Sequence, residues 1–117
     1  MTPSVIRMIV EEAQAAAKKA SVYYLTETLR WEDAFPCGYA WLNVYRLNGE
    51  KIRSNSKVGK GLALCGITKD TYEGSFRWSN PSDIYVQNVD CKYEGAQAAK
   101  EVFAKYGFEA IVGSRWD

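Results

Sequence analysis

Thiol and carboxylate side chains are the candidates for catalysis in this sequence, because the chain contains no histidine. Cys37 lies between Pro36 and Gly38, in a context that resembles the tight turn of a nucleophile. A cysteine nucleophile needs an adjacent base, and histidine is the commonest base. Carboxylates such as Glu32 and Asp33 are expected in surface loops, without the apolar surroundings that acid–base catalysis requires. The residue types therefore predict no catalytic residues and a protein that is not an enzyme.

The sequence also lacks the motifs that hold nucleotides and metal ions. Residues 58–61 (VGKG) contain a lysine between glycines but lack the GxxxxGK[ST] spacing of a phosphate-binding loop. The three cysteines, Cys37, Cys65 and Cys91, form no CxxC pair, so a structural zinc site is not expected. Their odd number and wide spacing argue against a disulfide framework. We therefore predict three reduced thiols in a cytoplasmic protein, with no cofactor and no metal.

Charged side chains point to binding instead, and they are unevenly distributed. The chain carries 15 basic and 14 acidic residues, so no overall field favours nucleic acid or an anionic membrane. Residues 35–60, however, contain five basic side chains and one acidic side chain. The C-terminal end adds an arginine and a tryptophan, residue types that are enriched at binding hot spots. We predict a partner-binding surface that combines the basic hairpin with this end, namely Lys51, Arg53, Lys57, Arg115 and Trp116.

In this prediction Trp116 anchors the complex, while the basic residues steer an acidic partner, since exposed charges mainly raise association rates. The first alternative is a nucleic-acid-binding module that uses the basic segment 46–60, where Tyr45 adds a ring for stacking. If neither region binds, the working surface is expected on the face of Tyr39 and Trp41. A cryptic enzyme and a minor virion component are the remaining alternatives.

A long amphipathic helix is expected to begin at Pro3 and to continue to about Leu29. Thr2 is a suitable N-cap, and proline fits the first helical position because its missing N–H needs no partner there. Apolar residues recur at helical spacing from Ile6 to Tyr24. The middle of this stripe is rich in alanine, which lets another backbone approach closely. The stripe is expected either to cover the sheet or to form a homodimer face made of Ala13, Ala16, Ala17 and Ala20.

The middle of the chain is typical of strands and turns. Residues 37–45 alternate aromatic and aliphatic side chains and are largely apolar on both faces, as in a central strand. Such a strand is covered on both sides, or covered on one side and adhesive on the other. Asn48-Gly49 is a strong hairpin signal, with residues 51–54 as the return strand. Further strands are expected over residues 67–72, 74–79 and 83–89.

Two segments need separate treatment. Residues 57–65 fit either a short helix or an extended segment, because two glycines weaken the helix. Near the C-terminus, Asp90 is expected to cap a helix over residues 91–106, which a glycine then ends. A final strand over residues 108–112 and a short tail over residues 113–117 are expected to follow.

This order of elements predicts an α+β fold: a mainly antiparallel sheet of five to six strands with two long helices packed on one face. The length suits a single domain over residues 1–117. No uninterrupted apolar run approaches the ~20 residues of a membrane helix. We therefore expect a soluble protein that does not insert into membranes.

Four parts of the sequence resemble a group of small, uncharacterised proteins of tailed bacteriophages. They are the CGYAW run at residues 37–41, the cluster Tyr72, Gly74 and Trp78, the helix over residues 90–106, and the ending GSRWD at residues 113–117. The resemblance covers most of residues 37–117 and implies expression in the cytoplasm of a bacterial host. By analogy, it implies a small phage-type binding protein that acts stoichiometrically on a host macromolecule, as a host-takeover or anti-defence inhibitor.

Overall fold

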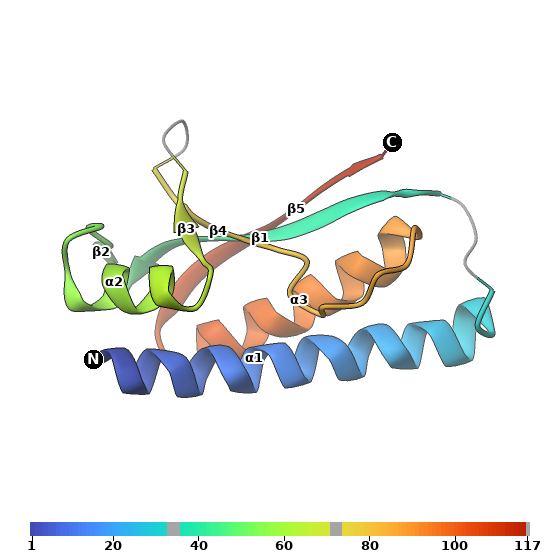
Figure 1. The fold of residues 1–117 in the computed structure, drawn as a ribbon, viewed down its shortest axis with the longest axis horizontal. Coiled ribbons are helices and arrows are strands. Elements are labelled where there is room, and N and C mark those ends of the chain that lie inside the picture. Colours follow the sequence, from blue (N-terminus) through green and yellow to red (C-terminus); the bar gives the residue numbers. More distant parts are fainter. Residues whose placement is uncertain (33–35, 71–73, 117) are drawn as a thin grey trace.

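The computed structural model describes residues 1–32, 36–70 and 74–116, and it confirms an α+β fold. The elements are α1 (Pro3–Tyr24) with a π-helical continuation η1 (Leu25–Leu29), β1 (Gly38–Leu47), β2 (Glu50–Lys51), α2 (Lys57–Leu64), β3 (Thr68–Lys69), β4 (Phe76–Ser79), α3 (Val89–Lys105) and β5 (Phe108–Trp116). The described strands form one antiparallel sheet of five strands, and the two long helices lie on one side of it (Figure 1). No helix in the described ranges is both long enough and apolar enough to cross a membrane.

β1 is the central strand of this sheet. Along one edge it pairs with β5, from Gly38 opposite Trp116 to Leu47 opposite Phe108. Along the other edge it pairs with β4 over Trp41–Val44 and then with β2 at the hairpin, while β3 lies outside β4. Among the described strands, β5 pairs with β1 alone. The outer edge of β5 is therefore one of the open edges of the sheet.

The first helix begins where the sequence predicts. The Thr2 side chain accepts a hydrogen bond from the Val5 N–H, and Pro3 occupies the first helical position. The predicted extent to Leu29 is confirmed with one difference, because the last five residues are π-helical. Arg30 and Trp31 then adopt positive φ angles of 49° and 64°, which ends the helix. Left-handed backbone of this kind cannot continue a right-handed helix.

α1 and α3 approach closely because small residues meet between them. Ala13 and Ala17 are fully buried. A Cβ on Gly95 of α3 would lie 2.5 Å from Ser21 Oγ and 3.1 Å from the Ala17 carbonyl oxygen. At the same place Ser21 Oγ donates to the Cys91 carbonyl at 2.8 Å, and Cys91 Sγ donates back to the Ser21 carbonyl at 3.4 Å. Small residues of α1 therefore serve a contact between two helices of the same chain.

The segment that the sequence left open between helix and strand is the helix α2. Ser56 caps it by accepting the Gly59 N–H at 3.0 Å. A Cβ on Gly59 would collide with the Arg53 carbonyl oxygen, and a Cβ on Gly61 would lie 3.1 Å from the Ile6 side chain. The glycines that lower the helix propensity are thus the residues that let α2 pack against its own entry loop and against α1.

The predicted strand over residues 83–89 is wrong. Asn80 and Asp83 adopt positive φ angles of 51° and 53°, which turn the chain out of the sheet after β4. The only pairing recorded for this described segment is an isolated antiparallel bridge between Cys37 and Asn88. The alternating apolar residues of this segment therefore belong to irregular backbone. The sheet formed by the described strands has five strands, the lower number of the predicted five to six.

The C-terminal third needs two more corrections. α3 is capped by Asn88, whose side chain accepts the Cys91 N–H at 2.9 Å, so Asp90 lies in the first turn instead of capping it. The predicted tail is not a tail, because β5 continues to Trp116 and its second half pairs with Trp41–Gly38. Backbone pairing with a central strand thus extends β5 beyond its apolar residues.

The short strands are shorter than the sequence predicts. The Asn48-Gly49 turn is confirmed, with positive φ angles of 51° and 80°, but its return strand is only Glu50–Lys51. The strand predicted over residues 67–72 is only Thr68–Lys69, and part of that prediction lies outside the described residues. None of the three cysteines forms a disulfide, as predicted.

Candidate functional site

A pocket of about 470 Å³ opens where β4 leaves the edge of β1. The ladder between the two strands ends at Trp41 and Ser79. Beyond it, the Asn80 N–H donates to the Ala40 carbonyl at 3.3 Å, and the Gly38 N–H donates to Gln87 at 2.9 Å. The lining consists of three rings, three cations and three smaller residues: Tyr39, Trp41 and Tyr85; Arg77, Lys92 and Arg115; Ala40, Ser79 and Asn80.

Strand alternation places two of the rings on the face of the sheet that the helices leave open. Ala40, Leu42 and Val44 point into the core and are at most 3% exposed. Since successive side chains of a strand point to opposite faces, Tyr39 and Trp41 point away from the helices. Tyr39 is 51% exposed, while Trp41 is half-buried. The sequence left open whether this strand is covered on both faces or on one. The structure supports a strand that the helices cover on one face only.

The Trp41 indole lies against the backbone of β5. A Cβ on Gly113 would collide with the indole atoms, so the glycine makes room for the ring. Trp41 Nε1 is buried there and has no hydrogen-bond partner among the described residues. Packing, and not a hydrogen bond from the indole N–H, therefore fixes the ring in this position.

The three cations of the pocket lie over its rings. Arg77 Cζ is 4.7 Å from the centroid of the Trp41 ring. Lys92 Nζ and Arg115 Cζ lie 5.2 Å and 5.9 Å from the centroid of the Tyr39 ring. All three distances are within the ~6 Å at which a cation is attracted to a ring face. Because the cations come from β4, α3 and β5, only the folded chain brings them together.

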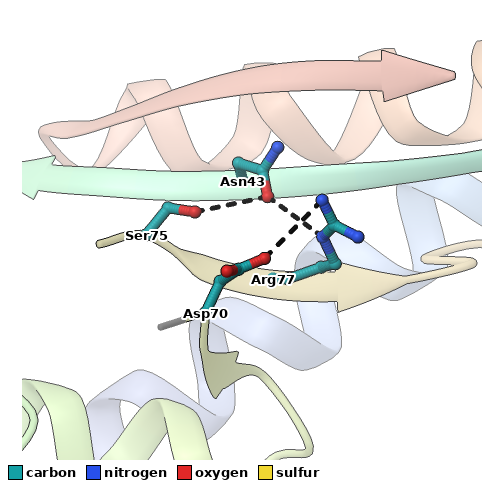
Figure 2. Close-up of polar contacts among 4 residues, drawn as sticks. All are labelled: Asn43, Asp70, Ser75 and Arg77. Atoms are coloured by element: carbon teal, nitrogen blue, oxygen red, sulfur yellow. Dashed lines mark hydrogen bonds and ion pairs between the residues drawn. The ribbon is translucent and has the colours of Figure 1, made fainter. Parts of the chain in front are cut away.

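Arg77 is oriented by polar partners on two sides. Its Nε donates to Asn43 Oδ1 at 3.5 Å, and the same oxygen accepts from Ser75 Oγ at 3.4 Å. A terminal nitrogen of Arg77 lies 3.7 Å from Asp70 Oδ2. Figure 2 shows the guanidinium held between Asn43 and Asp70. The Asn43 side chain is only 5% exposed, so this anchor is part of the sheet itself.

The electrostatic character of the pocket is cationic. None of the nine described lining residues carries a carboxylate. Asp70 and Asp83 are the carboxylates bonded to lining residues: Asp70 pairs with Arg77, and Asp83 accepts from the Tyr85 hydroxyl at 2.8 Å. That hydrogen bond raises the pKa of Tyr85 above its ordinary value. The Tyr85 hydroxyl therefore stays protonated near pH 7.

Binding of an anion that also carries a flat ring is the chemistry that this arrangement can perform. Arginine and lysine supply donors for anionic oxygens, and the exposed parts of the Tyr39 and Tyr85 rings supply stacking surface. Within the described residues, no group of three histidine, cysteine or acidic side chains is placed to hold a metal ion.

The predicted partner-binding residues do not form one surface. Lys51, Arg53 and Lys57 are exposed around β2 and the start of α2, at one end of a molecule 42 Å long (Figure 1). Arg115 of β5 pairs with Tyr39 of β1, whereas Lys51 of β2 pairs with Arg46 of β1. Tyr39 and Arg46 are seven residues apart, which is roughly 23 Å along a strand. Arg115 lines the pocket, whereas the basic hairpin lies away from it.

The predicted homodimer face on α1 is only partly accessible. Ala13 and Ala17 are covered by their own chain. Ala16 and Ala20 are half-buried and line an open hollow with Tyr23 and Tyr24. Two of the four predicted alanines therefore remain for a contact with a second copy.

Sequence reasoning missed Arg77, Lys92 and Tyr85. A sequence signal existed for Arg77, because it lies between Phe76 and Trp78 on a strand whose aromatic residues point to the core. No comparable signal exists for Lys92 or Tyr85, because the start of α3 and the irregular segment before it reach the pocket through tertiary contacts.

No family model, curated protein or solved structure matched the chain. The fold and the pocket therefore define the class: an α+β protein with a cationic, ring-lined pocket on the open side of its sheet. The resemblance to bacteriophage proteins stays a prediction.

Proposed function

We propose that this is a stoichiometric binding protein and that its partner is a single-stranded nucleic acid, held at the pocket of Tyr39 and Trp41. One observation carries the proposal: three cationic side chains lie over two rings in a pocket whose described lining has no carboxylate. A nucleotide has the complementary pair of features, a flat base and an anionic phosphate. Proteins hold unpaired strands by stacking bases on rings while cations follow the backbone.

The exposure of the rings favours an unpaired strand over a duplex. Tyr39 and Tyr85 are 51% and 88% exposed, so each has surface to offer to a base. A base that remains stacked in a duplex cannot reach such a ring. The pocket volume of about 470 Å³ lies within the usual range of small-ligand sites, roughly 300–1,000 Å³. The pocket therefore suits a few unstacked nucleotides.

Fluorescence anisotropy with a labelled single-stranded oligonucleotide tests this proposal. Stacking on one ring contributes ~1–3 kcal/mol per base, so Tyr39→Ala is expected to weaken binding about fivefold or more. Tyr23→Ala is the matched control, because Tyr23 is 69% exposed on α1 and does not line the pocket. The control is expected to bind like the unmodified protein.

The salt dependence gives a second readout. Each phosphate contact to a single strand contributes about 0.7 to the slope of log affinity against log salt, so three cations predict a slope of about −2. Arg115→Gln should reduce the size of this slope by about 0.7.

Two outcomes contradict the proposal. If the oligonucleotide does not bind, or binds equally well to Tyr39→Ala, the pocket is not a nucleic-acid site. If an acidic peptide with aromatic residues binds at the pocket while the oligonucleotide does not, the partner is a protein. That second result would favour the host-protein inhibitor that the bacteriophage resemblance implies.

A further inference from the structure

The outer edge of β5 is long and lacks proline, lysine and a bulge of its own, three of the features that usually prevent strands from pairing. The strand has nine residues, Phe108–Trp116, without proline or lysine. The register irregularity between β1 and β5 lies on β1, between Val44 and Arg46. Proline, lysine and bulges are the common means by which proteins protect an open edge. An edge without them is a template for another strand.

We infer that two copies of this chain pair through their β5 edges, in antiparallel orientation across a two-fold axis. In such an interface, if residue i of one copy lies opposite residue j of the other, then j also lies opposite i. The register that uses all nine residues is therefore centred on Val112. It places Phe108 opposite Trp116 and Glu109 opposite Arg115, twice each.

This full-length register is also the one that pairs opposite charges. Glu109 and Arg115 are six residues apart, so their side chains lie on the same face of the strand. Both are exposed, and Glu109 has only a loose contact with Arg46, at 3.9 Å. A shift of two residues in one direction would put Glu109 opposite Gly113, and the opposite shift would put Arg115 opposite Ile111. Only the centred register matches acid with base.

The same register covers apolar surface that the single chain leaves exposed. Trp116 is 71% exposed and would lie beside the Phe108 end of the partner strand. Ile111 is 57% exposed and would lie opposite Gly113, where no side chain obstructs it. Cross-strand pairs of opposite charge and of large apolar residues both stabilise antiparallel strands. Charge complementarity and apolar cover therefore select a second copy as the occupant of this edge.

Sedimentation equilibrium without nucleic acid, over micromolar to millimolar concentrations, tests the inference independently of the proposed function. The unmodified protein is expected to reach twice the 13.2 kDa of one chain. Arg115→Glu and Glu109→Arg each place like charges opposite each other at two positions. Each variant should weaken self-association by at least about tenfold. Lys18→Glu is the matched control, because it reverses an exposed charge on α1.

The decisive experiment mixes the two variants. A chain with Glu109→Arg carries two arginines on this edge, and a chain with Arg115→Glu carries two glutamates, so the mixed pair regains both matched contacts. The mixture is expected to associate like the unmodified protein. A mass of 13.2 kDa for the unmodified protein at every concentration overturns the inference. So does a dimer that persists in both variants, or two dissociated variants that do not associate when mixed.

Discussion

At the scale of single residues, Glu12 connects the two long helices through its carboxylate. It accepts hydrogen bonds from Lys105 Nζ and, at 2.5 Å, from the Tyr106 hydroxyl. These bonds lower the pKa of Glu12 below its ordinary value, and the bond from Lys105 has the largest effect. The same contacts raise the pKa values of Lys105 and Tyr106.

The stability that Glu12 contributes should therefore depend on pH. A carboxyl with a lowered pKa in the folded state stabilises above its unfolded pKa, and this contribution is lost as the pH falls through the folded pKa. The raised pKa values of Lys105 and Tyr106 act in the opposite sense, since their contribution is lost as the pH rises through those values. Glu12→Gln should therefore lower the free energy of unfolding most near neutral pH. Urea unfolding of both proteins across pH measures this, and a cost that does not change with pH would contradict it.

Trp41 shows how a single residue can be placed by shape alone. A buried indole N–H without a partner costs ~1–3 kcal/mol, so something else must hold the ring. The absence of a side chain at Gly113 and the Arg77 cation over the ring provide that support. The ring on the open face is thus fixed before any ligand arrives, which reduces the ordering cost of binding.

At the scale of elements, the close contact between α1 and α3 decides whether Gly95→Ala raises or lowers stability. Helix propensity alone would predict that the substitution stabilises the protein. Gly95→Ala should raise the intrinsic helix propensity of α3 by ~1 kcal/mol. The added Cβ, however, would lie 2.5 Å from Ser21 Oγ and 2.8 Å from Ser82 Cβ. Overpacking of this kind typically costs ~1–3 kcal/mol. Overpacking therefore outweighs the gain in helix propensity, and we expect a net loss of stability of up to ~2 kcal/mol.

Thermal or urea unfolding measures this loss. Glu94→Ala, at the neighbouring exposed position of α3, is the control and should change stability by less than ~0.5 kcal/mol. If Gly95→Ala is as stable as the unmodified protein, the two helices can separate at this point and the small residues are not required.

At the scale of the whole molecule, the two basic regions are too far apart to act on one short ligand. The hairpin residues and Arg115 are separated by roughly 23 Å along β1, more than two Debye lengths of about 8 Å at physiological salt. The double variant Lys51→Glu/Arg53→Glu changes the net charge by −4, from +1 to −3. We still expect it to bind a four-nucleotide single strand within about twofold of the unmodified protein.

Anisotropy at physiological ionic strength checks this expectation, with Arg115→Glu as the comparison. Arg115→Glu reverses a charge inside the pocket and should weaken binding more than the double change at the hairpin. If the hairpin variant loses binding while Arg115→Glu retains it, the working surface is the basic segment that the sequence predicts.

The sequence by itself determined the features that depend on neighbouring residues. Thr2 and Pro3 start α1, and Asn48-Gly49 makes the hairpin, because caps and turns are set by local hydrogen bonds and φ angles. The alternation along residues 37–45 predicts the central strand, which the structure places at Gly38–Leu47, but it leaves open whether one face or both faces are covered. The α+β class follows from the order of these elements, and the structure confirms it.

Only the tertiary structure decided which residues those elements contact and pair with. Asn80 and Asp83 turn residues 84–88 out of the sheet, although the apolar alternation there resembles a strand. Pairing with β1 converts the expected tail into half of β5 and places Arg115 opposite Tyr39. The pocket therefore depends on strand register and on α3 delivering Lys92. A one-residue shift would move every side chain of a strand to the other face, and contacts between residues far apart in the sequence fix that register.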